Sequence, residues 1–234
     1  IKGRVPFIHF FDGFRTSHEI QKIEVLDYEV FNKLVDHEAI QEFRNRALNP
    51  EKPVLRGSAQ NPDIFFQAKE ASNKFYLEIP DLVNDYMKEI NKITGRDYRP
   101  FNYYGPADAE NIVVAMGSVC EALEETIDYL VARGEKVGLI KVHLYRPFSS
   151  KYFFDVLPKG VKRIAVLDRC KEPGALGEPL YQDIRTLFYE RAHSPLIVGG
   201  RYGLGSKDVT PSQLKAVFDN LKADEPKNNF TIGI

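Results

Sequence analysis

The sequence predicts an α/β protein, in which residues from 111 to the end of the chain form a three-layer α/β/α domain around a mostly parallel, doubly wound sheet. The first observation is that short apolar runs, typical of strands buried on both faces, alternate there with amphipathic helical segments. The second is that turn glycines and helix-capping residues separate the two kinds of segment. Connections of this length favour right-handed crossovers between parallel strands, with helices on both faces of the sheet.

The stretch Asn111–Leu123 shows this pattern most clearly. Its first half is an unbroken apolar run and predicts a central strand. Gly117 suits the tight turn that follows, and Ser118 with Glu121 has the spacing of a capping box at the start of a helix. Gly134 is expected to end that helix. Strand, turn and helix together form the first half of a strand–helix–strand unit.

The rest of the carboxyl-terminal half repeats the same order of elements. Further strands are predicted at Val137–Leu144, Arg163–Asp168, Pro195–Val198 and Phe230–Ile234. Helices are predicted from Ser149 or Ser150 to Val156, from Leu180 to about Ala192, and from a capping box at Thr210 and Gln213 to Leu221.

The amino-terminal part, residues 1 to about 102, follows a less regular pattern. Strands are predicted at Pro6–Phe11, which ends at the turn signal Asp12-Gly13, and at Ile23–Leu26. Helices are predicted after a capping box at Thr16 and Glu19, at Asp36–Ala47, at Asp63–Lys69, and at Asp81–Thr94 with Pro80 as the first helical residue. The region Arg96–Asp108 is rich in aromatic and turn residues, and we place a domain boundary within it, near residue 103.

Composition and charge exclude several classes of function. The net charge is −1 with acidic and basic residues interspersed, so the chain has no electrostatic attraction to nucleic acid or to an anionic membrane. No apolar run approaches the ~20 residues that a bilayer span needs. No signal peptide is expected from the opening residues, and the two cysteines, Cys120 and Cys170, are expected to be reduced thiols. A cytoplasmic location is therefore expected.

Arg15, Thr16 and His18 are the candidate binding residues. They follow the carboxyl end of a predicted strand, which is the edge where open α/β sheets bind ligands. They are therefore candidates to face a cleft and to contact a cofactor there. The pattern alone favours the alternative interpretation, in which Thr16 only caps a helix, His18 is solvated, and Arg15 pairs with a surface acid. No catalytic residue and no set of metal ligands is assigned.

Two other motifs favour a structural role. Gly199–Ser206 contains two glycines of a dinucleotide-binding fingerprint, but Asp208 takes the place of the third glycine and the next helix starts later. We interpret this segment as a loop that needs positive φ angles. Asp168 ends a strand and is expected to accept backbone N–H groups of the following loop. His9 and His143 alternate with apolar residues and are expected within the core or on a sheet face.

Several segments together resemble one family. They are Pro6–Glu19, Gly57–Phe66, Ile112–Glu121, Val137–Phe148, Val166–Ala175 and Gly200–Lys207. These segments resemble pyruvate:ferredoxin (flavodoxin) oxidoreductase, a large single-chain 2-oxoacid oxidoreductase, along essentially the whole chain. The resemblance implies that residues 1–102 are the carboxyl-terminal portion of a thiamine-diphosphate pyrimidine-binding α/β domain. Residues 103–234 would be a domain similar to the carboxyl-terminal domain of transketolase, and the chain an internal fragment of a longer polypeptide.

The resemblance also implies an activity for the complete enzyme. That enzyme oxidatively decarboxylates pyruvate with coenzyme A to acetyl-CoA and CO2, and passes electrons through [4Fe-4S] clusters to ferredoxin or flavodoxin. It uses thiamine diphosphate with Mg2+, and members of the family are typically homodimers. The family's G-D-G motif and its cysteine runs are absent from this sequence. We therefore expect the fragment alone to bind none of these cofactors, to be inactive, and to serve structure and assembly within its own polypeptide.

Two other functions remain open from the sequence. The first is a stand-alone nucleotide-binding module that uses Gly199–Gly205, and the second is a dimerisation module that uses Arg96–Tyr104. Calorimetry with NAD, ATP, coenzyme A and thiamine diphosphate distinguishes the nucleotide-binding module from a segment of the enzyme, because micromolar binding of NAD or ATP would favour the module. Light scattering, with substitutions at Tyr103 and Tyr104, tests the second.

Overall fold

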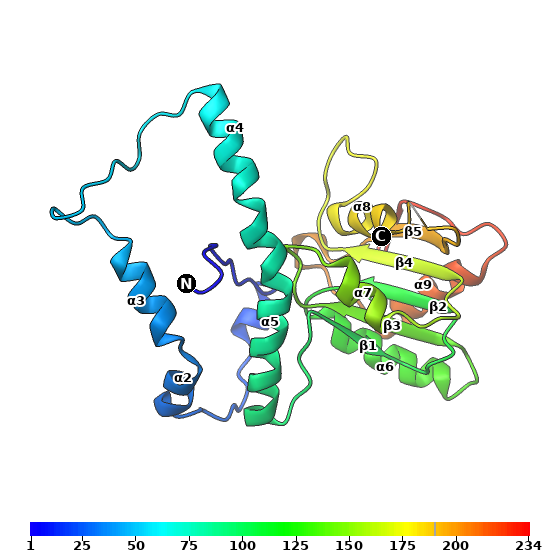
Figure 1. Ribbon diagram of the computed structural model, residues 1–234. Helices are drawn as coiled ribbons and strands as arrows, with labels where there is room; N and C mark the ends of the chain where they lie inside the picture. The colour runs from blue at the N-terminus through cyan, green and yellow to red at the C-terminus, as the bar shows by residue number, and fades with distance from the viewer. Residues whose placement is uncertain (190) are drawn as a thin grey trace. The chain divides into compact units, whose positions relative to one another are not determined.

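The computed structural model describes residues 1–189 and 191–234, which divide into two compact units (Figure 1). The first unit contains residues 1–9 and 21–97, and the second contains residues 10–20 and 98–234. No helix of the described residues is both long and apolar enough to cross a bilayer.

A six-stranded sheet forms the centre of the second unit. Its strands are β1 (Phe101–Tyr104), β2 (Asn111–Ala115), β3 (Val137–Val142), β4 (Arg163–Asp168), β5 (Leu196–Arg201) and β6 (Phe230–Thr231). They lie in the order β1-β3-β2-β4-β5-β6. The pairs β2–β3, β2–β4, β4–β5 and β5–β6 are parallel, which confirms the predicted mostly parallel sheet. β1 pairs with β3 in the antiparallel direction, so these aromatic residues form an edge strand and not the linker that their composition suggested.

Helices cover both faces of the sheet, as the three-layer prediction requires (Figure 1). Helices α6 (Val119–Val131) and α9 (Pro211–Lys222) pack on one face, where β2 contributes Val113 and Ala115. Helices α7 (Ser150–Val156) and α8 (Pro179–Phe188) pack on the other, where β2 contributes Ile112 and Val114. Because side chains alternate along a strand, the apolar run of β2 supplies both cores.

The first unit is helical in its described residues. Its helices are α2 (Tyr28–Leu34), α3 (His37–Asn45), α4 (Pro62–Ala71) and α5 (Asn73–Thr94). Asp36 caps α3 by accepting the N–H of Ala39 at 2.9 Å, and Gly95 ends α5 with a φ of 69°. The predicted start of α5 at Pro80 is wrong, because the helix continues through Pro80, which is buried. Helix α2 was not predicted.

The predicted strands at Pro6–Phe11 and Ile23–Leu26 are both wrong. Neither segment pairs with a strand among the described residues. Four side chains of the first segment are between 59% and 87% exposed; they are Phe7, Ile8, Phe10 and Phe11. A strand requires a neighbouring edge to hydrogen-bond with, and apolar composition alone does not supply one.

The predicted helix starts had mixed outcomes. The capping box of Thr210 and Gln213 is confirmed. Thr16 does not cap, because it lies within α1 (Arg15–His18) and Phe14 is the residue before that helix. Ser118 precedes α6 with helical φ and ψ angles and makes no capping hydrogen bond, since its hydroxyl is engaged elsewhere.

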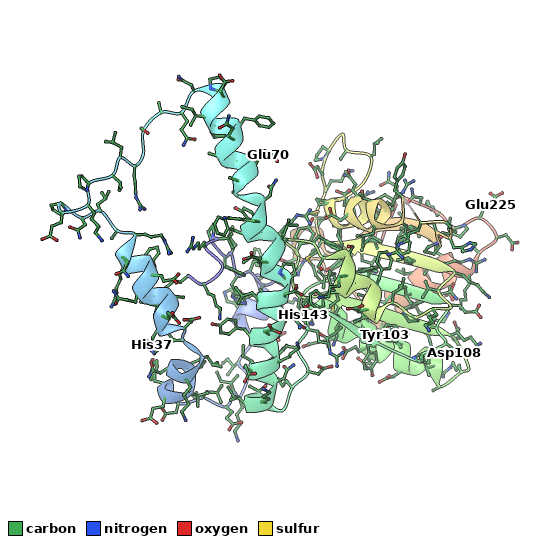
Figure 2. All side chains as sticks on the ribbon, in the orientation of Figure 1. His37, Glu70, Tyr103, Asp108, His143 and Glu225 are labelled. Atoms are coloured by element: carbon green, nitrogen blue, oxygen red, sulfur yellow. The ribbon has the colours of Figure 1, made fainter. Side chains whose placement is uncertain are left out.

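The remaining differences are smaller. Helix α8 ends at Phe188, and its predicted extension to about Ala192 crosses residue 190, which lies outside the described residues. His9 and His143 are exposed and lie outside the strands, so the expectation that they lie in the core or on a sheet face is wrong; Figure 2 labels His143, which is the residue after β3.

Candidate functional site at the carboxyl edge of the sheet

The segment Phe10–Ile20, called the edge segment below, belongs to the same compact unit as the sheet. Its contacts lie at the carboxyl ends of β2 and β4, which are adjacent parallel strands. From β2 the chain continues through α6 to β3 on one side, and from β4 it continues through α8 to β5 on the other. In open α/β sheets, ligands bind in the crevice where neighbouring connections diverge in this way.

Asp12 joins the edge segment to the sheet. Its Oδ2 accepts the backbone N–H of Ser118 at 2.6 Å and the Ser118 hydroxyl at 2.5 Å. Its Oδ1 lies 2.9 Å from Nη1 of Arg169, the first residue after β4. The Asp12 side chain is only 16% exposed and that of Arg169 26% exposed, so solvent screens this ion pair less than an ordinary surface pair.

The same contacts set the protonation of Asp12. Burial of the carboxyl works to raise its pKa, whereas the hydrogen bonds from Ser118 and the charge of Arg169 work to lower it. The lowering effects prevail, and the pKa of Asp12 lies below its usual value of 3.8. Asp12 is therefore a carboxylate throughout the neutral pH range.

Gly117 makes room for this carboxylate. Its φ of 80° lies in the left-handed region that side chains rarely adopt. A Cβ atom at this position would lie 2.7 Å from Oδ2 of Asp12, which is too close for a real contact. The glycine predicted as a tight turn therefore has a second role, which is to let the edge segment approach the end of β2.

Two further contacts hold the surrounding loops. The Tyr202 hydroxyl, at the end of β5, donates to the carbonyl oxygen of Met116 at 3.3 Å. Nε of Arg169 donates to the carbonyl oxygen of Gly203 at 3.2 Å. Arg169 thus links the loop after β5 to Asp12, and the carboxyl ends of β2, β4 and β5 form one connected surface.

A cavity of about 130 Å³ lies against this surface. It is lined by Gly13, Arg15, Thr16, Ser118, Val119, Ala122, Arg169, Tyr202, Gly203, Ser206, Lys207, Asp208 and Val209. Two of the three predicted binding residues, Arg15 and Thr16, therefore reach the cavity. His18 is not among the described residues that line it; its Nδ1 lies 2.5 Å from the carbonyl oxygen of Phe14.

Charges of both signs surround the cavity. Arg15 Nη2 lies 3.0 Å from Oδ2 of Asp208, as the alternative interpretation of Arg15 anticipated. Arg169 is neutralised by Asp12, and Lys207 adds a third cation. The positive groups of the site therefore lie beside two carboxylates of the same chain, those of Asp12 and Asp208.

Sequence reasoning missed the central members of this site. Asp12 was interpreted as a turn residue, Ser118 as a helix cap, and Arg169 as part of a loop. The available signal was positional, since all three follow segments with strand-like apolar runs. Their pairing was not visible, because Asp12 and Ser118 are 106 residues apart.

The glycine loop has the predicted positive φ angles, and Asp168 has a structural role, but the N–H groups that Asp168 accepts belong to α8 and not to the loop that was predicted to supply them. Gly203 and Gly205 have φ angles of 62° and 61°, as a loop with positive φ requires. Asp168 accepts the N–H groups of Leu180 at 3.0 Å and Tyr181 at 3.1 Å, at the start of α8. These oxygens satisfy two donors of a helix start, which is a structural use of the carboxylate.

Comparison with known proteins identifies two family regions. Residues 1–88 match the model described as pyruvate flavodoxin/ferredoxin oxidoreductase, thiamine diP-bdg. Residues 109–214 match pyruvate:ferredoxin oxidoreductase core domain II. Asp12 lies in the first region, and Ser118 and Arg169 lie in the second. The hydrogen bonds at the sheet edge therefore join residues of both regions within one compact unit.

Curated relatives cover the whole chain. It is 62% identical over 234 residues to a pyruvate-flavodoxin oxidoreductase of Enterobacter agglomerans. It is likewise 62% identical to a pyruvate:ferredoxin oxidoreductase of Moorella thermoacetica. The chain spans about 20% of the length of these relatives. A solved structure of a 2-oxoglutarate:ferredoxin oxidoreductase from Magnetococcus marinus aligns with 70% of this chain and 24% of its own, at 14% identity and a TM-score of 0.43.

The fold and the two regions define the class of thiamine-dependent 2-oxoacid oxidoreductases. Within that class, the chain belongs to the pyruvate:ferredoxin (flavodoxin) oxidoreductase family. The resemblance carried by the sequence motifs is thereby confirmed.

The family's cofactors can be compared with the residues present. A [4Fe-4S] cluster needs four thiolates, and this chain has two cysteines. Among residues 1–189 and 191–234, no three His, Cys, Asp or Glu side chains form a group that could hold a metal ion. The cavity of about 130 Å³ is smaller than the ~300 Å³ at which sites for drug-sized ligands begin. The described residues therefore offer no complete ligand set for a cluster or for Mg2+, this cavity does not fit thiamine diphosphate, and we derive no reaction step through these groups.

Proposed function

We propose that this chain is part of an enzyme that oxidatively decarboxylates pyruvate with coenzyme A and passes the electrons to ferredoxin or flavodoxin. Thiamine diphosphate, Mg2+ and [4Fe-4S] clusters belong to the complete polypeptide, which works as a homodimer in the cytoplasm. Identities of 62% to relatives named for this reaction support the proposal. The isolated chain is inactive, because the groups that would hold those cofactors are not complete within it.

In this proposal, residues 1–102 complete a thiamine-diphosphate pyrimidine-binding domain, and residues 103–234 form a domain similar to the carboxyl-terminal domain of transketolase. The match of residues 1–88 to a thiamine-diphosphate-binding model supports the first assignment. The α/β/α sheet with its antiparallel edge strand β1 supports the second.

Within the enzyme, the chain builds a wall of the active-site cleft. Arg15, Thr16 and His18 face that cleft from the edge segment. The observation that carries this proposal is the anchoring of the edge segment by Asp12 to Ser118 and Arg169, at the sheet edge where ligands bind in such folds. The wall supplies orientation and excludes water, and the reacting groups come from the cofactors.

The test is pyruvate turnover by the complete polypeptide that carries this chain. Arg15→Ala and Thr16→Ala are each expected to lower kcat/KM for pyruvate or for coenzyme A by about tenfold or more, because misplaced groups in a cleft lose orientation. Lys88→Ala is the matched control, since Lys88 pairs with Asp85 at 3.0 Å on an exposed helix face of the other unit. Unchanged kinetics in both variants and in His18→Ala would remove these residues from the cleft.

A further inference from the structure

Three hydrogen-bond donors converge on one carboxylate at the sheet edge. The backbone N–H and the hydroxyl of Ser118 both point to Oδ2 of Asp12, and the guanidinium of Arg169 meets Oδ1. Ser118 stands at the start of α6, a helix of 13 residues, so the positive end of the helix dipole adds to the attraction. Backbone N–H, hydroxyl and guanidinium groups at a helix start form the kind of site that binds anions.

We propose that this is an anion site whose ligand is built into the chain: the Asp12 carboxylate occupies it and thereby positions the edge segment. Asp12 is a positioning residue and does not contact the reacting atoms. The anchoring itself is independent of the proposed function. Its consequence for turnover rests on that function, because it is the edge segment that carries Arg15 and Thr16 to the cleft.

A second tie of this segment to the loops of the sheet is weaker. Arg15 and Asp208 form an ion pair at 3.0 Å, but their side chains are 72% and 56% exposed. Exposed pairs of this kind contribute little, because water and salt screen them. Asp12 is mostly buried and receives charge-assisted bonds, so it contributes more to the anchoring than the Arg15–Asp208 pair does.

The geometry around Asp12 also excludes a larger anion in its presence. Oδ2 already occupies the space that a Cβ atom on Gly117 would enter, at 2.7 Å. The Arg169 guanidinium is held in place by the carbonyl oxygen of Gly203. A free carboxylate can therefore bind here only in a variant that lacks the Asp12 side chain. Formate is small enough to do so, because it consists of the carboxylate group that such a variant has lost.

The experiment uses the complete polypeptide and follows amide hydrogen exchange by mass spectrometry in a peptide that contains Ser118. In the native protein, the Ser118 N–H donates to Asp12, so this amide is expected to exchange slowly. Asp12→Ala is expected to raise the exchange rate of this amide by about tenfold or more, as loss of a charge-assisted hydrogen bond predicts. Formate is expected to restore the protection, and chloride at the same ionic strength is not.

Three variants separate the anion site from general loss of structure. Asp208→Ala removes only the exposed pair and should leave the Ser118 amide protected. Asp12→Asn keeps the shape without the charge, so it should show partial protection that formate does not improve. In the double variant Asp12→Ala/Arg169→Ala the receptor is missing, and formate should have no effect.

Native-like protection of Ser118 in Asp12→Ala would overturn the proposal. Equal effects of formate and chloride would overturn it as well. Pyruvate turnover measured on the same samples keeps the two proposals apart. If formate restores amide protection while turnover never changes, the anion site stands and the assignment of the edge segment to the catalytic cleft fails.

Discussion

Gly200 lies in β5 beneath the ring of Phe230 on the neighbouring strand β6, and this pair explains why position 200 requires a glycine. A Cβ atom at Gly200 would lie 2.2 Å from Cε2 and 2.3 Å from Cζ of Phe230, whereas ordinary van der Waals contact begins at 3.4 Å. Gly200→Ala therefore forces the ring or β6 to move by more than about 1 Å. Because overpacking of this kind typically costs ~1–3 kcal/mol, we expect the free energy of unfolding to fall by about 2 kcal/mol.

A double-mutant cycle isolates the contribution of the ring. In the Phe230→Ala background the clash is absent, so adding Gly200→Ala should be neutral or stabilising by up to ~1 kcal/mol, since glycine loses more backbone freedom on folding than alanine. The expected coupling energy is therefore about 2 kcal/mol. The four proteins are compared by urea unfolding, followed by circular dichroism.

Gly160→Ala is the matched control. Around its Cβ position, the nearest atom is the carbonyl oxygen of Ala109 at 3.9 Å, so its effect should stay within about 0.5 kcal/mol. Additive effects of Gly200→Ala and Phe230→Ala would refute the packing argument. Binding of NAD or ATP that Gly200→Ala abolishes without a change in stability would favour the nucleotide-binding alternative.

Three more predictions concern buried groups of the second unit. Arg201 pairs with Glu178 at 3.1 Å, so Glu178→Ala leaves the Arg201 guanidinium as an uncompensated buried charge. We expect the free energy of unfolding, measured in urea, to fall by about 3 kcal/mol, and a loss below about 1 kcal/mol would contradict this. Burial raises the pKa of Cys120 to about 12 and that of Cys170 to about 11. A thiol reagent at neutral pH should therefore modify both cysteines of the folded chain slowly, and Cys120 last. Rapid modification of Cys120 would contradict its burial. Burial raises the pKa of Asp168 to about 6, above its ordinary 3.8, so its charge costs stability above about pH 6 and that cost is relieved as the pH falls. Relative to Asp168→Asn, the wild type should therefore gain up to ~3 kcal/mol between about pH 7 and about pH 4, and an unchanged difference would refute the shift.

The sheet could be predicted because its strands are buried on both faces. A segment such as Ile112–Ala115 must be apolar at every position, and its sequence therefore differs from that of a helix or a loop. The antiparallel strand β1 escaped prediction, since its aromatic and turn-rich surroundings resemble a linker. The opposite error occurred at Pro6–Phe11, where a strand was predicted from the composition but no described neighbour pairs with the segment.

The candidate site could be located from sequence but not assembled. Arg15 and Thr16 were found from their position after a strand-like segment, and both line the cavity. The site itself depends on Asp12 meeting Ser118 across 106 residues of chain. Local patterns describe neighbours within a few residues, so Ser118 was interpreted as a helix cap while its hydroxyl bonds to a distant carboxylate.

The most direct test of the account is electron transfer by the complete polypeptide that carries this chain, purified with its cofactors. We expect reduction of ferredoxin or flavodoxin that depends on pyruvate and on coenzyme A together and that yields acetyl-CoA and CO2. Removal of thiamine diphosphate should abolish the reaction, and its return should restore it. Reduction that proceeds equally well without pyruvate, or a polypeptide that retains thiamine diphosphate yet never oxidises pyruvate, would contradict the account.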